Sequence, residues 1–183
     1  MLGNDWNSRQ IRKALIEDYP YLHPRDVHGN LIEDYDFDYL EGELDLPEGW
    51  FDLFLQCCED LKAPLEKAGL LYSFKFLQIK EKFGGMRIYV SNDIEEVRDI
   101  LAKYEFISRQ VCCVCGKPAT ALTKGWVCPC CDEHFEEFKA RGEEKLEPLN
   151  IQTTFTVRRF SQDGFSEEVI DCSNEWERYL KNI

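Results

Sequence analysis

Six of the nine cysteines in this 183-residue chain fall within one short stretch, and a histidine follows three positions after the last of them. The stretch holds two groups, C-C-V-C-G from Cys112 and C-P-C-C-D-E-H from Cys128, with a loop between them. Structural zinc takes four nitrogen or sulfur ligands in tetrahedral geometry, and these ligands come in short pairs of this kind. The residue types and their spacing therefore predict a structural Zn²⁺ site.

The first ligand pair is Cys112 and Cys115. A C-x-x-C-G turn aims two thiolates at one point, and its glycine, Gly116, relieves backbone strain in the turn. Cys113 is predicted to be a spare thiol. Disulfide bonds are not expected, because Met1–Trp6 does not look like a targeting signal and the number of cysteines is odd.

The second ligand pair has two alternatives. Cys128 and Cys131 form a C-x-x-C that would complete a four-cysteine site, whereas Cys131 and His134 form a C-x-x-H. Residues 132–142 have the pattern of a helix, so Cys131 and His134 would lie one turn apart on the same face, which suits two ligands of one metal. The preferred metal ligands are Cys112, Cys115, Cys131 and His134, with Cys128 as the substitute.

The net charge of −13 is concentrated in one part of the chain. Between Asp26 and Leu61 there are twelve acidic residues and no lysine or arginine. Such a field repels nucleic acids and membrane surfaces and attracts basic protein surfaces. A charge run usually means a solvated loop, but aromatic residues are interleaved with these acids, which favours a contact surface. The residues predicted to bind a partner are Asp34, Tyr35, Asp36, Phe37, Asp38, Tyr39, Glu41 and Glu43.

Basic residues converge at one place in this acidic chain. A glycine pair between two strand-like segments predicts a β-hairpin, and Lys80 and Lys82 would point the same way along its first strand. Glycines at the turn would let a ligand approach the backbone. The residues predicted to bind a small anion, such as a nucleotide, are Lys80, Lys82, Gly84, Gly85 and Arg87. An ordinary solvated sheet face and an internal dock for the acidic stretch are the alternatives.

Signs of catalysis are few. His23, Asp26 and His28 stand close together and could supply metal ligands or a general base for a hydrolase or nuclease. Serine, cysteine and threonine stand in no recognisable nucleophile motif. The chain is therefore expected to be a binding protein rather than an enzyme.

The hydrophobic pattern predicts an α+β fold, in which antiparallel hairpins are covered by helices and a zinc knuckle of treble-clef or ribbon type is inserted. Helices are expected over 5–18, over 49–68 with a break at Pro64, from Asn92 with Glu95 as its capping-box partner, over 132–142 and over 174–183. Strands are expected over 72–83, 86–90, 153–160 and 165–171.

The expected organisation is a core over 1–111 that contains an acidic loop at 19–48. The zinc-binding segment follows at 112–147, and a hairpin and helix at 148–183 complete the same domain. Cys57 and Cys58 lie in an apolar helical run and are predicted to be core residues. The longest apolar runs are too short for a membrane span, and a reducing cytoplasm is the expected location.

The segment I-K-E-K-F-G-G-M-R-I-Y-V, from Ile79 to Val90, resembles the signature of a group of small bacterial and bacteriophage proteins. In that group a KEKFGG-(L/M)-R-(F/I)-Y strand pair is followed by a helix, C-x-x-C-G, G-W and C-x-x-H. The segment Gly49–Leu53 is similar to a glycine–tryptophan segment in the same group. The resemblance covers Gly49 to His134, less than half of the chain, and implies the Cys₃His ligand set and a bacterial or phage source. The group has no settled activity.

The resulting hypothesis is a zinc-stabilised, phage-encoded inhibitor of a host protein. Its partner would be a host nucleic-acid-binding or defence protein with a basic surface. The inhibitor would act by direct protein binding or by DNA mimicry, in which carboxylates take the place of DNA phosphates. Direct binding of nucleic acid or membrane is not expected. A small-anion binder at the basic hairpin and a metal-dependent hydrolase at the histidines are the alternatives.

Overall fold

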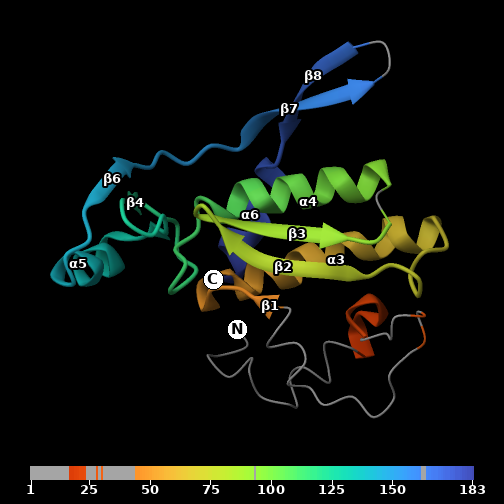
Figure 1. Cartoon of the computed structure of the whole chain (residues 1–183), viewed down its shortest axis with the longest axis horizontal. Helices are drawn as coiled ribbons and strands as arrows, with labels where there is room; N and C mark the ends of the chain where they lie inside the picture. The colour runs from red at the N-terminus through yellow and green to blue at the C-terminus, as the bar shows by residue number, and fades with distance from the viewer. Residues whose placement is uncertain (1–16, 24–27, 29, 31–43, 93, 162–163) are drawn as a thin grey trace.

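The computed structural model describes residues 17–23, 28, 30, 44–92, 94–161 and 164–183 (Figure 1). It has the α+β architecture that the sequence predicts. Its helices are η1 Pro20–Leu22, η2 Glu48–Trp50, α3 Phe51–Lys67, α4 Glu95–Ser108, α5 Asp132–Ala140 and α6 Ser173–Asn182. Its strands are β1 Leu44–Asp45, β2 Phe76–Lys82, β3 Gly85–Val90, β4 Ala121–Thr123, β5 Pro129–Cys130, β6 Lys145–Pro148, β7 Thr154–Ser161 and β8 Gly164–Asp171.

The core lies between the sheet β1-β2-β3 and the helices α3 and α4 (Figure 1). β2 and β3 form the expected antiparallel hairpin. β1 pairs parallel with β2, with Leu44 opposite Ile79, which the sequence pattern did not predict. β1 has only two residues, so it is too short to show the alternation of apolar and polar residues by which a strand is predicted.

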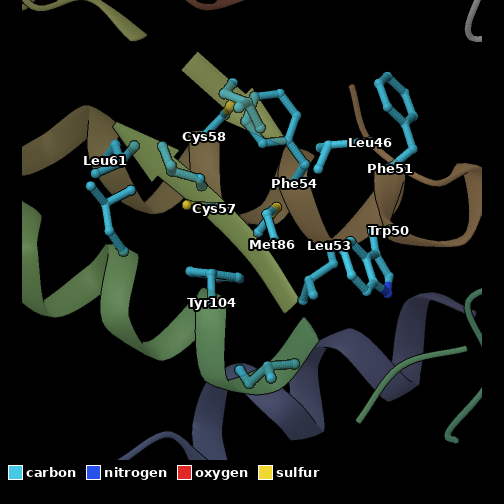
Figure 2. Packing of buried hydrophobic residues seen from close by; sticks show 14 of the residues in the cluster. Leu46, Trp50, Phe51, Leu53, Phe54, Cys57, Cys58, Leu61, Met86 and Tyr104 are labelled. Atoms are coloured by element: carbon cyan, nitrogen blue, oxygen red, sulfur yellow. The ribbon is translucent and has the colours of Figure 1, made fainter. Parts of the chain in front are cut away.

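A stripe of apolar side chains on α3 fills this core (Figure 2). Leu53 and Phe54 are buried in the first turn of the helix, and Leu61 and Leu65 continue the same face. Cys57 and Cys58 are fully buried free thiols, as predicted. Burial raises their pKa values well above that of an ordinary cysteine, so both stay protonated at neutral pH.

Two helix boundaries differ from the prediction. α3 is not broken at Pro64, because the buried Leu61 and Leu65 hold both sides of this proline in the core. α4 begins at Glu95 and has Ile94 as its N-cap residue, without a side-chain cap. The capping box expected from Asn92 does not form, since the Asn92 side chain donates a hydrogen bond to the carbonyl oxygen of Ser73 instead, at 3.3 Å.

The hairpin turn is shifted by one residue from the predicted Gly84-Gly85 pair. Its central residues are Phe83 and Gly84, with φ values of +53° and +75°, and Gly85 belongs to β3. Positive φ at both positions is what a two-residue type I′ turn requires. The Glu81 carboxylate fixes the turn by accepting the N–H of Gly84 at 2.8 Å.

Two smaller units complete the chain. The sheet β5-β4-β6 and α5 lie at one end of the molecule, and the β7–β8 hairpin projects from the other side (Figure 1). This hairpin and α6 match the expected C-terminal elements, whereas the sheet β5-β4-β6 was not predicted.

Of the helix expected over 5–18, only Glu17 and Asp18 are described, and both are helical. Among the described helices, none has the length and apolar character needed to cross a membrane.

Replacing Leu61 with alanine is expected to lower the free energy of unfolding by about 2–5 kcal/mol, because the substitution leaves a cavity in a fully buried site. The matched control is Leu77→Ala on β2, where the side chain is 56% exposed, and there the change should stay within about 0.5 kcal/mol. Urea unfolding followed by circular dichroism measures both. Equal effects of the two substitutions would contradict this assignment of the core.

Candidate metal centre

The first two side chains of the centre come from a tight turn that follows α4. The N–H of Gly116 donates to the carbonyl oxygen of Cys112 at 3.0 Å and closes the turn, and the N–H of Cys112 donates to the carbonyl oxygen of Lys117 at 2.8 Å. Gly116 has a φ of +77°, a conformation that favours glycine. The C-x-x-C-G spacing thus has the local effect that the sequence predicts.

The other two side chains come from the start of α5. Cys131 is the N-cap residue of this helix, and His134 lies in its first turn. The N–H of Phe135 donates to the carbonyl oxygen of Cys131 at 2.9 Å, so the helix begins directly at the ligand. The order of turn, β4–β5 hairpin and helix corresponds to the treble-clef alternative of the prediction.

The four ligand atoms of Cys112, Cys115, Cys131 and His134 lie within 4.8 Å of one another. The Sγ atoms of Cys115 and Cys131 are 3.8 Å apart, and Nδ1 of His134 lies 3.2 Å from Sγ of Cys131 and 3.6 Å from Sγ of Cys112. A tetrahedral centre with metal–sulfur bonds of about 2.3 Å places its sulfur atoms about 3.8 Å apart. The cluster could therefore hold one metal ion with four protein ligands.

Metal binding at Cys115 has to displace a proton. Without a metal, partial burial and the neighbouring thiols raise the pKa of Cys115 to about 12. A thiol binds metal as its thiolate, so binding must release the proton that Cys115 holds at neutral pH.

The turn that carries Cys112 and Cys115 sits directly against the core. A β-carbon at Gly49 would overlap the carbonyl oxygen of Cys112 and lie 2.7 Å from the backbone nitrogen of Gly116. The indole N–H of Trp50 donates to the carbonyl oxygen of Val111 at 2.9 Å. In the sequence, the only sign of this role is a glycine that directly precedes a large apolar residue, Trp50.

The C-terminal helix supports the same turn. The hydroxyl of Tyr179, a fully buried residue of α6, donates to the carbonyl oxygen of Gly116 at 2.6 Å. The sequence gives no sign of this role, because the two residues are far apart in the chain.

Cys113 and Cys128 form a disulfide, which corrects three predictions, the first of which is that the chain has no disulfide bonds. Cys113 is not a spare thiol, and Cys128 does not belong to the metal cluster. The N–H of Cys113 donates to the carbonyl oxygen of Pro129 at 2.9 Å, which brings the two cysteines to a Cα separation of 6.4 Å, within bridging range. The spacing of cysteines alone does not reveal this backbone contact.

The residues predicted to bind an anion are largely engaged within the protein. Lys80 and Arg87 lie directly opposite each other in the ladder, as expected, but Arg87 forms an ion pair with Glu105. The ammonium groups of Lys80 and Lys82 lie 5.5 and 5.6 Å from the ring centres of Tyr89 and Phe83.

The two glycines of this site make room for protein side chains. A β-carbon at Gly84 would lie 3.0 Å from Cγ1 of Val127, and one at Gly85 would lie 2.9 Å from Nε of Arg109. Anion binding at the hairpin stays a prediction.

The remaining predicted residues fall partly or wholly outside the described part of the chain. The acidic and aromatic residues from Asp34 to Glu43 lie outside it, and so does Asp26. His23 and His28 are described, but among the described residues the Cys₃His group is the one cluster that could hold a metal ion.

Comparisons with known proteins returned no match to a family model, to a curated protein or to a solved structure. The resemblance carried by Ile79–Val90 and by the cysteine spacing stays a prediction.

Cys115→Ser is expected to abolish stoichiometric metal binding and to unfold residues 112–142, because a serine oxygen is a poor replacement for a thiolate ligand. Metal analysis of the purified protein and hydrogen exchange of this segment measure the two effects. The matched control is Cys130→Ser in the same segment, since the Cys130 thiol lies outside the cluster and donates to the carbonyl oxygen of Ala121 at 3.5 Å. Metal retained by Cys115→Ser would show that the ligand set is wrong.

A second pair of variants separates the Cys₃His set from the four-cysteine alternative. His134→Ala should lose the metal, whereas Cys128→Ser should retain one ion per chain, because Cys128 is bonded to Cys113. The opposite result, with metal lost only from Cys128→Ser, would establish the four-cysteine set.

Proposed function

We propose that the protein is a zinc-stabilised interaction protein that binds a basic partner protein. The observation that carries this proposal is the set of four ligand atoms from Cys112, Cys115, Cys131 and His134, gathered within 4.8 Å. A catalytic zinc keeps three protein ligands and an open position for water, whereas a structural zinc takes four. The centre would therefore stabilise a binding surface rather than carry out a reaction.

Zinc is the metal that best suits these donors. Three thiolates and one imidazole form a soft ligand set, and tetrahedral sites of this composition hold Zn²⁺ in structural motifs. The four-residue cluster of Cys112, Ala121, Cys130 and Cys131 forms the buried centre of this segment. So small an apolar core leaves much of the folding energy to the metal.

The charge of the chain indicates the partner. A net charge of −13 attracts a protein with a basic surface, such as one that binds nucleic acid. The acidic stretch from Asp34 to Glu43 is the proposed contact region, and carboxylates that mimic DNA phosphates are one way in which it could compete with nucleic acid. We place this activity in the cytoplasm of a bacterial host, where a phage-encoded inhibitor would meet a defence protein.

The β7–β8 hairpin is a further surface that suits protein binding. Phe160 and Phe165 near its tip are 80% and 64% exposed, and Val169 is exposed on the same face. Arg158 and Glu167 form an ion pair between the aromatic pair and Val169. The base of the hairpin packs on α4, where the rings of Phe155 and Phe106 are stacked. A partner that covers the exposed face near the tip would stabilise the rest, because two strands alone are only marginally stable in water.

A small-anion binder at Lys80, Lys82 and Arg87 is the second candidate function. The direct opposition of Lys80 and Arg87 favours it, whereas the Arg87–Glu105 ion pair reduces the charge that is free for a ligand. A hydrolase at His23, Asp26 and His28 is not supported by a described cluster.

An affinity capture from bacterial host lysate tests the principal proposal. The native chain should capture a basic, nucleic-acid-binding protein, and the complex should weaken as the salt concentration rises because the attraction is between charges. Mass spectrometry identifies the captured protein, and titration of that purified protein measures the affinity.

The matched bait carries neutral amides at Asp34, Asp36, Asp38, Glu41 and Glu43. Its affinity for the same purified protein should fall at least about tenfold. Close charge pairs at an interface contribute about 1.5 kcal/mol or more, and about 1.4 kcal/mol corresponds to a tenfold change in affinity. Equal affinity of the two baits would show that the acidic stretch is not part of the contact surface.

A further inference from the structure

A cavity of about 260 Å³ lies where the metal-binding segment meets the core. Its apolar walls include Trp50, Trp126 and Phe138, and the Cys113–Cys128 disulfide lines it as well. Small-molecule sites usually have volumes of about 300–1,000 Å³. The cavity is therefore closer in size to one inserted side chain than to a cofactor.

Two carboxylates line this apolar cavity, from Glu81 on β2 and Glu143 after α5. Glu81 accepts the N–H of Gly84 at 2.8 Å, and Glu143 accepts the N–H of Gly125 at 3.1 Å. Each of these bonds uses one carboxylate oxygen and leaves the other available. Within the part of the chain that the structure describes, neither carboxylate forms an ion pair, and the cavity lining contains no lysine or arginine.

The nearby lysines are directed elsewhere. Lys124 pairs with Glu144 at 2.7 Å, and Lys139 pairs with Glu136 at 3.2 Å. The ammonium group of Lys145 lies 5.5 Å from the ring centre of Phe135. The negative charge of the cavity is thus left for a cation from outside the described chain.

The local backbone is built to hold both the aromatic side chain and the acid. Trp126 stands in the β4–β5 turn with 73% of its surface exposed, and its carbonyl oxygen accepts the hydroxyl of Thr123. A β-carbon at Gly125 would lie 2.7 Å from the Glu143 carboxylate, so a larger residue here would displace the carboxylate from its present position on the Gly125 N–H.

From this geometry we infer that the cavity binds the side chain of an arginine or lysine on the partner protein. The aliphatic stem of such a side chain would pack on Trp126 and Phe138, and its charged end would meet Glu81 and Glu143. Pro47, which also lines the cavity, comes shortly after the acidic stretch in the sequence. The inference rests on the proposed function, because it names the group of the basic partner that this site recognises.

Short peptides test the site without the partner. The probes are acetyl-Gly-Arg-Gly amide, acetyl-Gly-Lys-Gly amide and acetyl-Gly-citrulline-Gly amide, where citrulline keeps the shape of arginine without its charge. Titration of the metal-loaded protein, followed by the indole N–H signals in NMR spectra, should show about tenfold tighter binding of the arginine or lysine peptide than of the citrulline peptide. Equal binding of all three peptides, or no saturable binding, would overturn the inference.

Variants locate the binding. The double variant Glu81→Gln with Glu143→Gln should remove the preference for the charged peptides, since the amides keep the backbone hydrogen bonds but lose the charge. Trp126→Ala should weaken all three peptides. Glu136→Gln, an exposed acid on α5, is the matched control and should change nothing. An unchanged preference in the double variant would also overturn the inference, provided that it retains its metal.

The peptide titration and the lysate capture can fail independently of each other. Peptide binding with an empty lysate capture would keep the cationic side-chain site and remove the proposed host partner. Capture that depends on the acidic stretch, together with no peptide binding, would keep the partner and remove this site.

Discussion

The backbone contact between Gly49 and the turn from Cys112 to Gly116 is the constraint on which the arrangement of the two halves depends. A side chain at Gly49 would overlap the turn, so the contact exists only because this position is glycine. The neighbouring Trp50 is buried in the core and also holds Val111 at the entrance to the turn. One pair of residues therefore connects the packing of α3 to the placement of two metal ligands.

A metal ion at the Cys₃His cluster would stabilise a segment that has little apolar interior of its own. No residue of α5 is fully buried, and the strands of the sheet β5-β4-β6 are two to four residues long. Small units of this kind fold when disulfides or metals supplement the hydrophobic core. Here a disulfide is present and a metal ion could be bound, since Cys113–Cys128 lies beside the Cys₃His cluster and joins the turn to the β4–β5 connection.

The features that could be predicted from the sequence are those carried by local spacing. The C-x-x-C-G turn, the helical position of His134 and the apolar stripe of α3 each involve residues within a few turns of one another. The unpredicted features join distant segments, as in the pairing of β1 with β2, the Cys113–Cys128 disulfide and the hydrogen bond from Tyr179 to Gly116. The capping box at Asn92 was wrong because a tertiary contact with Ser73 competed for the same side chain.

The placement of Tyr179 has a consequence for the order in which the chain matures. All four metal ligands lie between residues 112 and 134, so they leave the ribosome together and well before α6. A metal ion could therefore meet its complete ligand set while synthesis continues. The hydroxyl of Tyr179 reaches Gly116 only after the chain is nearly complete, so α6 docks against a turn whose metal ligands have all been synthesised.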